Sequence, residues 1–82
     1  MSNTYETTEY AAMMSRMMRS YGRRIATGDP SDLADAVKLQ RQLDAIIRDA
    51  VTAMRAESGF SWQQLADELG VTRQAAQQRY GR

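Results

Sequence analysis

The sequence predicts an all-α fold, with a long helical hairpin over residues 1–58 and two short helices within residues 59–82. Three observations favour this fold. Apolar residues recur at spacings of three and four, the single proline and most glycines fall where helices would begin or end, and no segment alternates as a strand does. The 82 residues fit one domain, residues 1–82. A chain of this length buries only about 60–65% of its unfolded surface, so a monomer would be marginally stable.

The first helix is expected from about residue 4 to residue 27. Asn3 and Glu6 have the spacing of a capping box, and Gly28 is expected to supply a left-handed residue after the helix end. Methionine-rich stripes form cores or adaptable protein surfaces. The apolar stripe of this helix consists of Tyr10, Met13, Met14, Met17, Met18, Tyr21 and Ile25.

The second helix is expected to begin at the segment DPSD and to continue to about residue 58. Asp29 suits the N-cap, Pro30 the first helical position, and Asp32 complements the helix dipole. Gly59 and Phe60 fit a glycine stop followed by a hydrophobe. The apolar face of this helix consists of Leu33, Val37, Leu39, Leu43, Ile46, Ile47, Ala50, Val51 and Met54.

The two short helices are predicted over residues 62–69 and 73–80. Ser61 and Gln64 form a second capping box, Thr72 caps the last helix and Gly81 ends it. Only Gly70 and Val71 separate the first of these helices from the cap of the next. Helices joined this tightly cannot lie side by side and antiparallel, so they are expected to cross at a large angle.

The connection between these helices has the residues that such a corner needs. Gly70 can adopt a positive φ cheaply, and the small side chain of Ala66 lets the second helix approach. Val71 is expected to fill the angle between the helices. Leu65 and Leu69 share the inner face of one helix, and Ala76 and Tyr80 share that of the next. Phe60 and Trp62 are expected in the core. The arrangement is a helix-turn-helix.

The segment SWQQLADELGVTRQAAQQRYG resembles the helix-turn-helix family, and looks like the short helix-turn-helix segments of small actinobacterial and actinophage proteins. The resemblance rests on Leu65, Ala66, Leu69, Gly70, Val71 and Thr72, and covers about the last quarter of the chain. Many members carry large aliphatic residues where Ala76 and Arg79 stand, so Tyr80 must supply that packing here. The resemblance implies DNA binding by the last helix.

Four polar residues are expected on the outer face of the last helix. The second helix of this motif lies in the DNA major groove, where arginine reads guanine and glutamine reads adenine. A polar helix face is also compatible with simple solvation. The predicted base readers are Arg73, Gln74, Gln77 and Gln78. Thr72, and Ser61 with Gln63 at the preceding helix start, suit phosphate contacts.

Composition argues against several other classes of function. The chain has no cysteine and no histidine, which removes thiolate metal sites, disulfides and the commonest general base. We therefore expect no enzyme, no metal and no cofactor. No apolar run approaches the roughly 20 residues of a membrane span, and a cytoplasmic location is expected. The net charge of +1 combines basic ends with an acidic middle.

The sequence also predicts the partners of the chain. The apolar surface of the hairpin exceeds what two short helices can cover, so we expect a homodimer on double-stranded DNA, with half-sites about 34–36 Å apart or a multiple of that. The predicted function is that of a small transcriptional regulator, such as a repressor or accessory factor of a phage or mobile element. The alternative is an adaptor that binds another regulator or a polymerase subunit through the methionine-rich helix.

Overall fold

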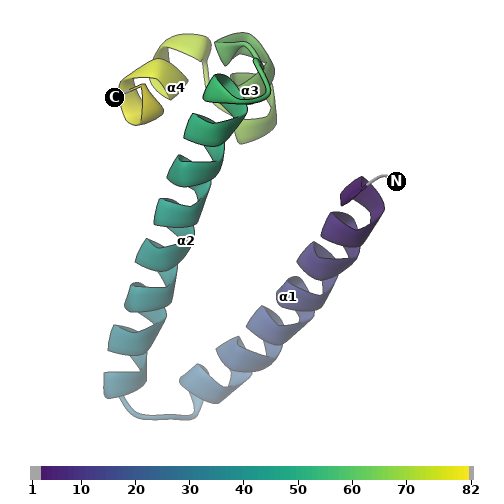
Figure 1. The fold of residues 1–82 in the computed structure, drawn as a ribbon. Coiled ribbons are helices and arrows are strands. Elements are labelled where there is room, and N and C mark those ends of the chain that lie inside the picture. The colour runs from purple at the N-terminus through teal and green to yellow at the C-terminus, as the bar shows by residue number, and fades with distance from the viewer. Residues whose placement is uncertain (1–2, 82) are drawn as a thin grey trace. The chain divides into compact units, whose positions relative to one another are not determined.

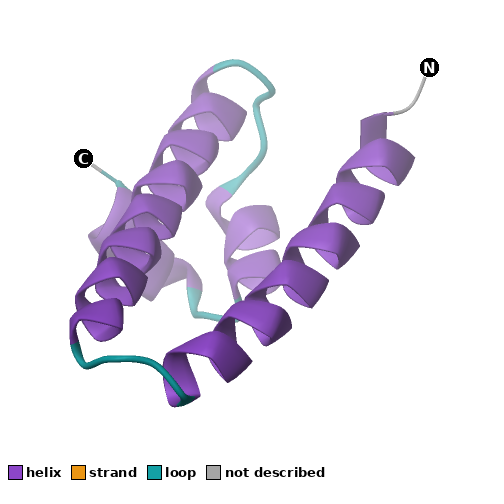
Figure 2. Cartoon of the chain, turned by 90° about the horizontal axis from the view of Figure 1, so that it is seen from below, coloured by secondary structure: helices purple, strands orange, loops and turns teal. Residues whose placement is uncertain are grey.

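The computed structural model describes residues 3–81, with side chains from residue 6 onward. These residues form four α-helices and no strand, which confirms the all-α prediction (Figures 1 and 2). The helices are α1 (Asn3–Ala26), α2 (Ser31–Ala56), α3 (Trp62–Leu69) and α4 (Arg73–Tyr80). The predicted bounds of α3 and α4 are matched to the residue. The capping contact predicted for Asn3 involves a side chain outside the described ones.

The chain forms two compact units that divide inside α2. The first is Met1–Val37 and contains α1 and the start of α2; the second is Lys38–Arg82 and contains the rest of α2 with α3 and α4. In the first unit, α1 and the start of α2 form a hairpin-like element. In the second, the last turns of α2 supply contacts to both short helices. The two short helices therefore fold together with about three quarters of α2.

The end of α1 corrects the prediction for Gly28. Among the described residues only Gly59 and Gly70 have positive φ, so Gly28 is not a left-handed cap. The Thr27 hydroxyl instead donates to the carbonyls of Arg23 and Arg24, and the Gly28 amide donates to the Ile25 carbonyl at 3.0 Å. A Cβ on residue 28 would collide with the Asp32 carboxylate. A side chain at this position would displace the Asp32 carboxylate, so the glycine is explained by this neighbour and not by its φ.

The start of α2 also differs in detail from the prediction. The helix begins at Ser31, one residue after Pro30. The Asp29 carboxylate accepts a hydrogen bond from the Ser31 hydroxyl at 2.8 Å. The Asp32 carboxylate reaches back to accept the Asp29 amide at 2.9 Å. Asp32 therefore closes the first turn of α2, as the returning member of a capping box does.

A small core holds the second unit together. It consists of Val51 from α2, Leu65 and Ala66 from α3, and Ala76 from α4, of which the two alanines are fully buried. Leu69, Val71 and Tyr80 are half-buried beside them. This confirms the predicted inner faces of α3 and α4. Because both alanines carry only a methyl group, the fully buried positions of the two short helices hold little side-chain volume.

The turn between α3 and α4 is a Schellman motif centred on Gly70, which has φ 72° and ψ 28°. The Val71 amide donates to the Ala66 carbonyl at 3.1 Å, and the Gly70 amide donates to the Asp67 carbonyl at 3.4 Å. These bonds satisfy carbonyls that the end of a helix leaves open. The left-handed conformation favours glycine strongly, as predicted.

Two arginines of α2 join it to the short helices. The Arg55 guanidinium lies 4.9 Å from the Trp62 ring centroid and donates to the Phe60 carbonyl at 3.0 Å. The Arg48 guanidinium lies 5.3 Å from the Tyr80 ring centroid and donates to the Arg79 carbonyl at 2.5 Å. Arg55 therefore fixes the start of α3, and Arg48 fixes the end of α4.

The prediction of core positions for Phe60 and Trp62 is wrong for Phe60. Trp62 is half-buried beneath Arg55, whereas Phe60 is 42% exposed and lines a surface hollow with Met54. The Phe60 amide donates to the Met54 carbonyl at 3.2 Å after the left-handed Gly59. This backbone bond holds the residue at the helix end, and leaves its ring at the surface.

We expect opposite effects from alanine at two glycines. Gly70→Ala forces a side chain into the left-handed region and should lower the free energy of unfolding by about 1–2 kcal/mol. Gly22→Ala, inside α1 with open space around its Cβ, should raise it by about 0.5–1 kcal/mol. Urea unfolding followed by circular dichroism measures both changes. Equal effects at the two positions would contradict the role of Gly70.

A larger side chain at Ala66 should overpack the corner. Ala66→Leu is expected to cost about 1–3 kcal/mol, because this position is fully buried. Ala12→Leu, at an exposed position of α1, is the matched control and should leave stability nearly unchanged. Thermal unfolding of both variants tests the contact. An unchanged melting temperature for Ala66→Leu would argue against a close approach of α3 and α4.

Candidate nucleic-acid interface

The outer face of α4 carries all four predicted base readers. Its inner side is defined by Ala76, which is fully buried, and by the half-buried Ala75 and Tyr80. At about 100° per residue, the four predicted base readers cover a continuous sector of roughly 140° around the helix. These exposed residues are Arg73, Gln74, Gln77 and Gln78. The structure therefore brings them together on one surface.

Thr72 is the N-cap of α4 and lies at the start of this surface. Its backbone is extended, with φ −73° and ψ 158°, and its side-chain oxygen accepts the Ala75 amide at 3.1 Å. The hydroxyl hydrogen remains available to donate outward. The amides of Arg73 and Gln74 lie in the first turn, where a helix supplies no internal acceptor. Thr72 and these amides form an anion-attracting end of α4.

Ser61 and Gln63 lie at the start of α3, and the structure engages both of them locally. The Ser61 hydroxyl accepts the Gln64 amide at 3.1 Å, and the Gln64 side chain accepts the Ser61 amide at 2.8 Å. This confirms the predicted capping box. The Gln63 side-chain amide donates to Asp67 at 2.8 Å. This bond uses one of the two hydrogens on the Gln63 amide nitrogen and places the Asp67 carboxylate beside the other.

The charge of the surface is modest. The helix α4 contains two arginines and no acidic residue. Residues 38–82 as a whole contain seven basic and five acidic residues. Such a balance supplies only weak general attraction to a polyanion, because non-specific affinity scales with the number of neutralised phosphates. Specific contacts from α4 would therefore have to supply much of the affinity.

Sequence reasoning missed the residue that supports this surface from behind. Arg48 contacts the Tyr80 ring and the Arg79 carbonyl at the C-terminal end of α4, where a cation also complements the helix dipole. Arg48 and Arg55 stand seven residues apart and so share one face of α2. This spacing could have identified both residues from the sequence, since two arginines on one face of a helix, among apolar residues, indicate contacts within the fold.

The described residues contain no group of three or more histidine, cysteine, aspartate or glutamate side chains placed to hold a metal ion. Over the same part of the chain, every helix is too short or too polar to cross a membrane. Comparisons with protein-family models, curated proteins and solved structures found no match. The case for function therefore rests on the surface itself.

Thr72 offers a way to separate folding from binding. Thr72→Ala removes the cap of α4 and should cost about 1 kcal/mol of stability. Thr72→Asp keeps a good cap and should preserve the free energy of unfolding to within about 0.5 kcal/mol. Urea unfolding of the two variants checks this. If both variants were equally destabilised, the capping role of the side chain would be refuted.

Proposed function

We propose that this protein binds double-stranded DNA sequence-specifically through α4 and acts as a small transcriptional regulator. The observation that carries the proposal is the composition of the outer face of α4. A helix of eight residues presents one arginine and three glutamines outward, and it is mounted on a rigid turn by two buried alanines. Both side-chain types can form paired hydrogen bonds with base edges.

The chemistry of the exposed residues fits the major groove. Arginine donates two hydrogen bonds to O6 and N7 of guanine, and glutamine pairs with N6 and N7 of adenine. Residues near the start of a recognition helix lie closest to the bases. Arg73 and Gln74 occupy the first turn of α4 and are the expected primary readers. Gln77 and Gln78 follow one turn later.

Thr72 supports the same binding mode from the backbone side. Its hydroxyl can donate to a phosphate while its oxygen still caps α4. Contacts of this kind fix the register of a helix on the duplex without reading sequence. The resemblance of residues 61–81 to helix-turn-helix segments, described above from the sequence, supports the proposal independently.

Selection of bound duplexes from a random pool tests the proposal directly. The intact chain should enrich a defined sequence, and Arg73→Ala or Gln74→Ala should relax preference at particular positions. Each lost contact should reduce discrimination by about 1–3 kcal/mol. Lys38→Ala removes the same charge from an exposed site on α2 and should keep the selected sequence. No enrichment by the intact chain would refute sequence-specific binding.

The Thr72→Asp variant adds a second readout. It should fold as stably as the parent chain, yet bind duplexes of every sequence more weakly, because its carboxylate repels phosphate. A uniform loss separates this residue from the base readers, whose loss changes sequence preference. Undiminished binding by Thr72→Asp would place the DNA elsewhere on the molecule.

The adaptor function is the second candidate, and the exposed methionines of α1 favour it. Met14, Met17 and Met18 are each at least half exposed. Methionine-rich surfaces adapt to varied protein partners. An adaptor would lose its partner on substitution in α1 and would be indifferent to Arg73→Ala. A DNA-binding regulator changes its sequence preference on Arg73→Ala, so this variant discriminates between the candidates.

A further inference from the structure

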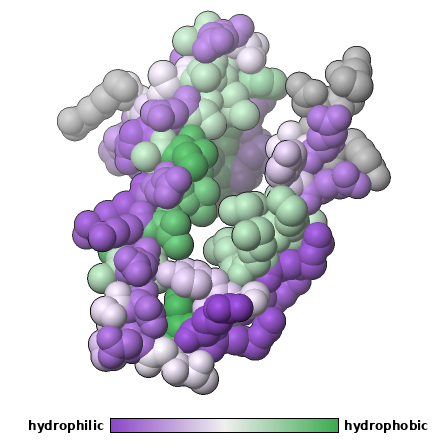
Figure 3. All heavy atoms as spheres, turned by 60° about the horizontal axis from the view of Figure 1, so that its bottom comes forward, coloured by the Kyte–Doolittle hydropathy of each residue, from purple (hydrophilic) through white to green (hydrophobic). Residues whose placement is uncertain are grey.

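The apolar stripe of α1 is exposed along most of its length. Tyr10 is 66% exposed, Met14 50%, Met17 57% and Met18 60%. Apolar side chains lie among hydrophilic ones over the visible surface of the molecule (Figure 3). Contiguous exposed apolar side chains on a soluble protein usually mark an interface.

With the half-buried Ile25 at its C-terminal end left out, the order of residues in this stripe is the same in both directions. It reads Tyr10, Met13, Met14, Met17, Met18 and Tyr21, with a midpoint between Ser15 and Arg16. A second copy of α1 that runs antiparallel about this midpoint would place tyrosine against tyrosine and methionine against methionine. Met14 would then face Met17 of the second copy at the centre of the contact.

The charges at the two ends of α1 complement each other in the same register. Glu6 and Arg24 are 18 residues apart, which is five helical turns, so both lie along one edge of the stripe. In the antiparallel arrangement, Glu6 comes level with Arg24 of the second copy to within one residue, about 1.5 Å. The two-fold axis repeats this pair at the other end. A parallel arrangement would oppose glutamate to glutamate.

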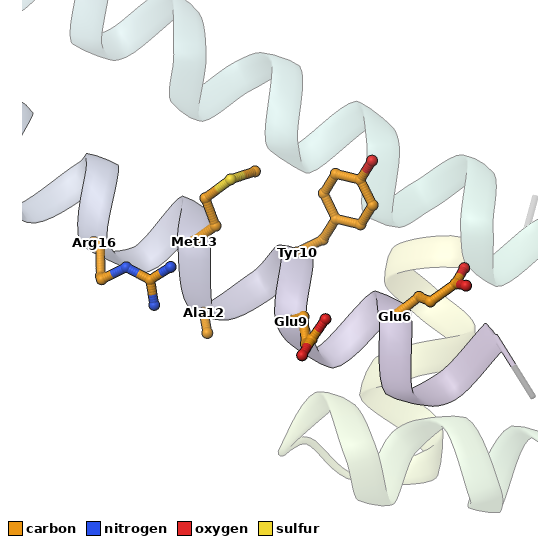
Figure 4. Close-up of a pocket in the computed structure, with 6 residues that line it drawn as sticks. All are labelled: Glu6, Glu9, Tyr10, Ala12, Met13 and Arg16. Atoms are coloured by element: carbon orange, nitrogen blue, oxygen red, sulfur yellow. The ribbon is translucent and has the colours of Figure 1, made fainter.

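The remaining charged groups of α1 leave the centre of the stripe clear. Arg19 donates to the Ser15 hydroxyl at 3.2 Å, on the side of α1 away from the stripe. Figure 4 shows six α1 residues that line a hollow: Glu6, Tyr10 and Met13 project from one side of the helix, and Ala12 projects from the other. Glu6 therefore lies on the same side of α1 as the apolar residues Tyr10 and Met13.

We propose that α1 forms an antiparallel homodimer contact through this stripe, with Glu6 paired to Arg24 of the second copy at both ends. The inference does not depend on DNA binding, since it concerns α1 alone. Six side chains per copy form a smaller contact than the roughly 800 Å² per partner of a standard interface, so micromolar dissociation is expected. Methionine suits such a contact, because its flexible side chain fills irregular gaps.

Sedimentation equilibrium of the intact chain, at roughly 10–500 µM, tests the association. The mass should rise toward twice the 9.3 kDa of one chain. Met17→Glu places an unpaired charge at the centre and should raise the dissociation constant by at least about 100-fold. Ala12→Glu adds the same charge on the opposite side of α1 and should leave association intact. A mass of one chain at every concentration would overturn the proposal.

Cysteine cross-linking tests the direction of the pairing, because the chain contains no native cysteine. Chains with Tyr10→Cys mixed with chains with Tyr21→Cys should form a disulfide faster than either chain alone. Faster cross-linking of each chain with itself would indicate parallel pairing and overturn the proposal.

Charge reversal tests the end contacts. Glu6→Arg and Arg24→Glu should each weaken the dimer by about 2–10-fold, and the double variant should restore it. Circular dichroism establishes that the single variants remain helical. Failure of the double variant to recover association, with helicity retained, would refute the Glu6–Arg24 pairing.

Discussion

The close approach of α3 and α4 is the contact on which the rest of residues 38–82 depends. Ala66 and Ala76 are both fully buried, and the left-handed Gly70 turns the chain sharply enough to bring α3 and α4 into contact. Any side chain larger than alanine at either position would separate the helices. Because the turn is only two residues long, a shift of α3 would displace Thr72 and the whole of α4 with it. The position of the outer surface therefore depends on small buried side chains on the inner faces of α3 and α4.

A helix such as α4 would not persist alone. Eight residues are fewer than the roughly 12–15 at which isolated helices become marginal in water. Three separate contacts compensate for this: the Thr72 cap at its start, Ala76 within the core, and Arg48 at its end. Since these contacts all lie on the inner side or at the ends, they leave the outer residues unconstrained by packing. The outer face of α4 can be polar because contacts at its inner face and its ends stabilise the helix.

Much of the fold could be predicted from the sequence, because its signals are local. Capping residues at Ser61 and Thr72 and the glycine at residue 70 set the bounds of α3 and α4 correctly. The errors concern tertiary context. Gly28 has the position of a left-handed cap, but its lack of a side chain serves the approach of Asp32. Phe60 has the hydrophobicity of a core residue, but a backbone bond to Met54 leaves it at the surface.

The candidate surface also has features that the sequence predicts and features that depend on tertiary contacts. The outward direction of Arg73, Gln74, Gln77 and Gln78 follows from helical periodicity once the inner face is known. The Gln63–Asp67 bond and the Arg48 support do not follow, since both depend on rotamers and on contacts between residues far apart in space or sequence. Local chemistry predicts which side chains lie on the outer face of α4, but not the side chains that bind Gln63 or support α4 from behind.

The exposed methionines of α1 also make the surface of the protein sensitive to oxidants. The chain has no cysteine, so thioethers are its sole sulfur groups, and Met13, Met14, Met17 and Met18 are all substantially exposed. Peroxide converts such side chains to sulfoxides, which are polar and chiral and no longer suit an apolar contact. The reaction is reversed by methionine sulfoxide reductases. The state of four sulfur atoms therefore determines whether this face of α1 is apolar or hydrophilic.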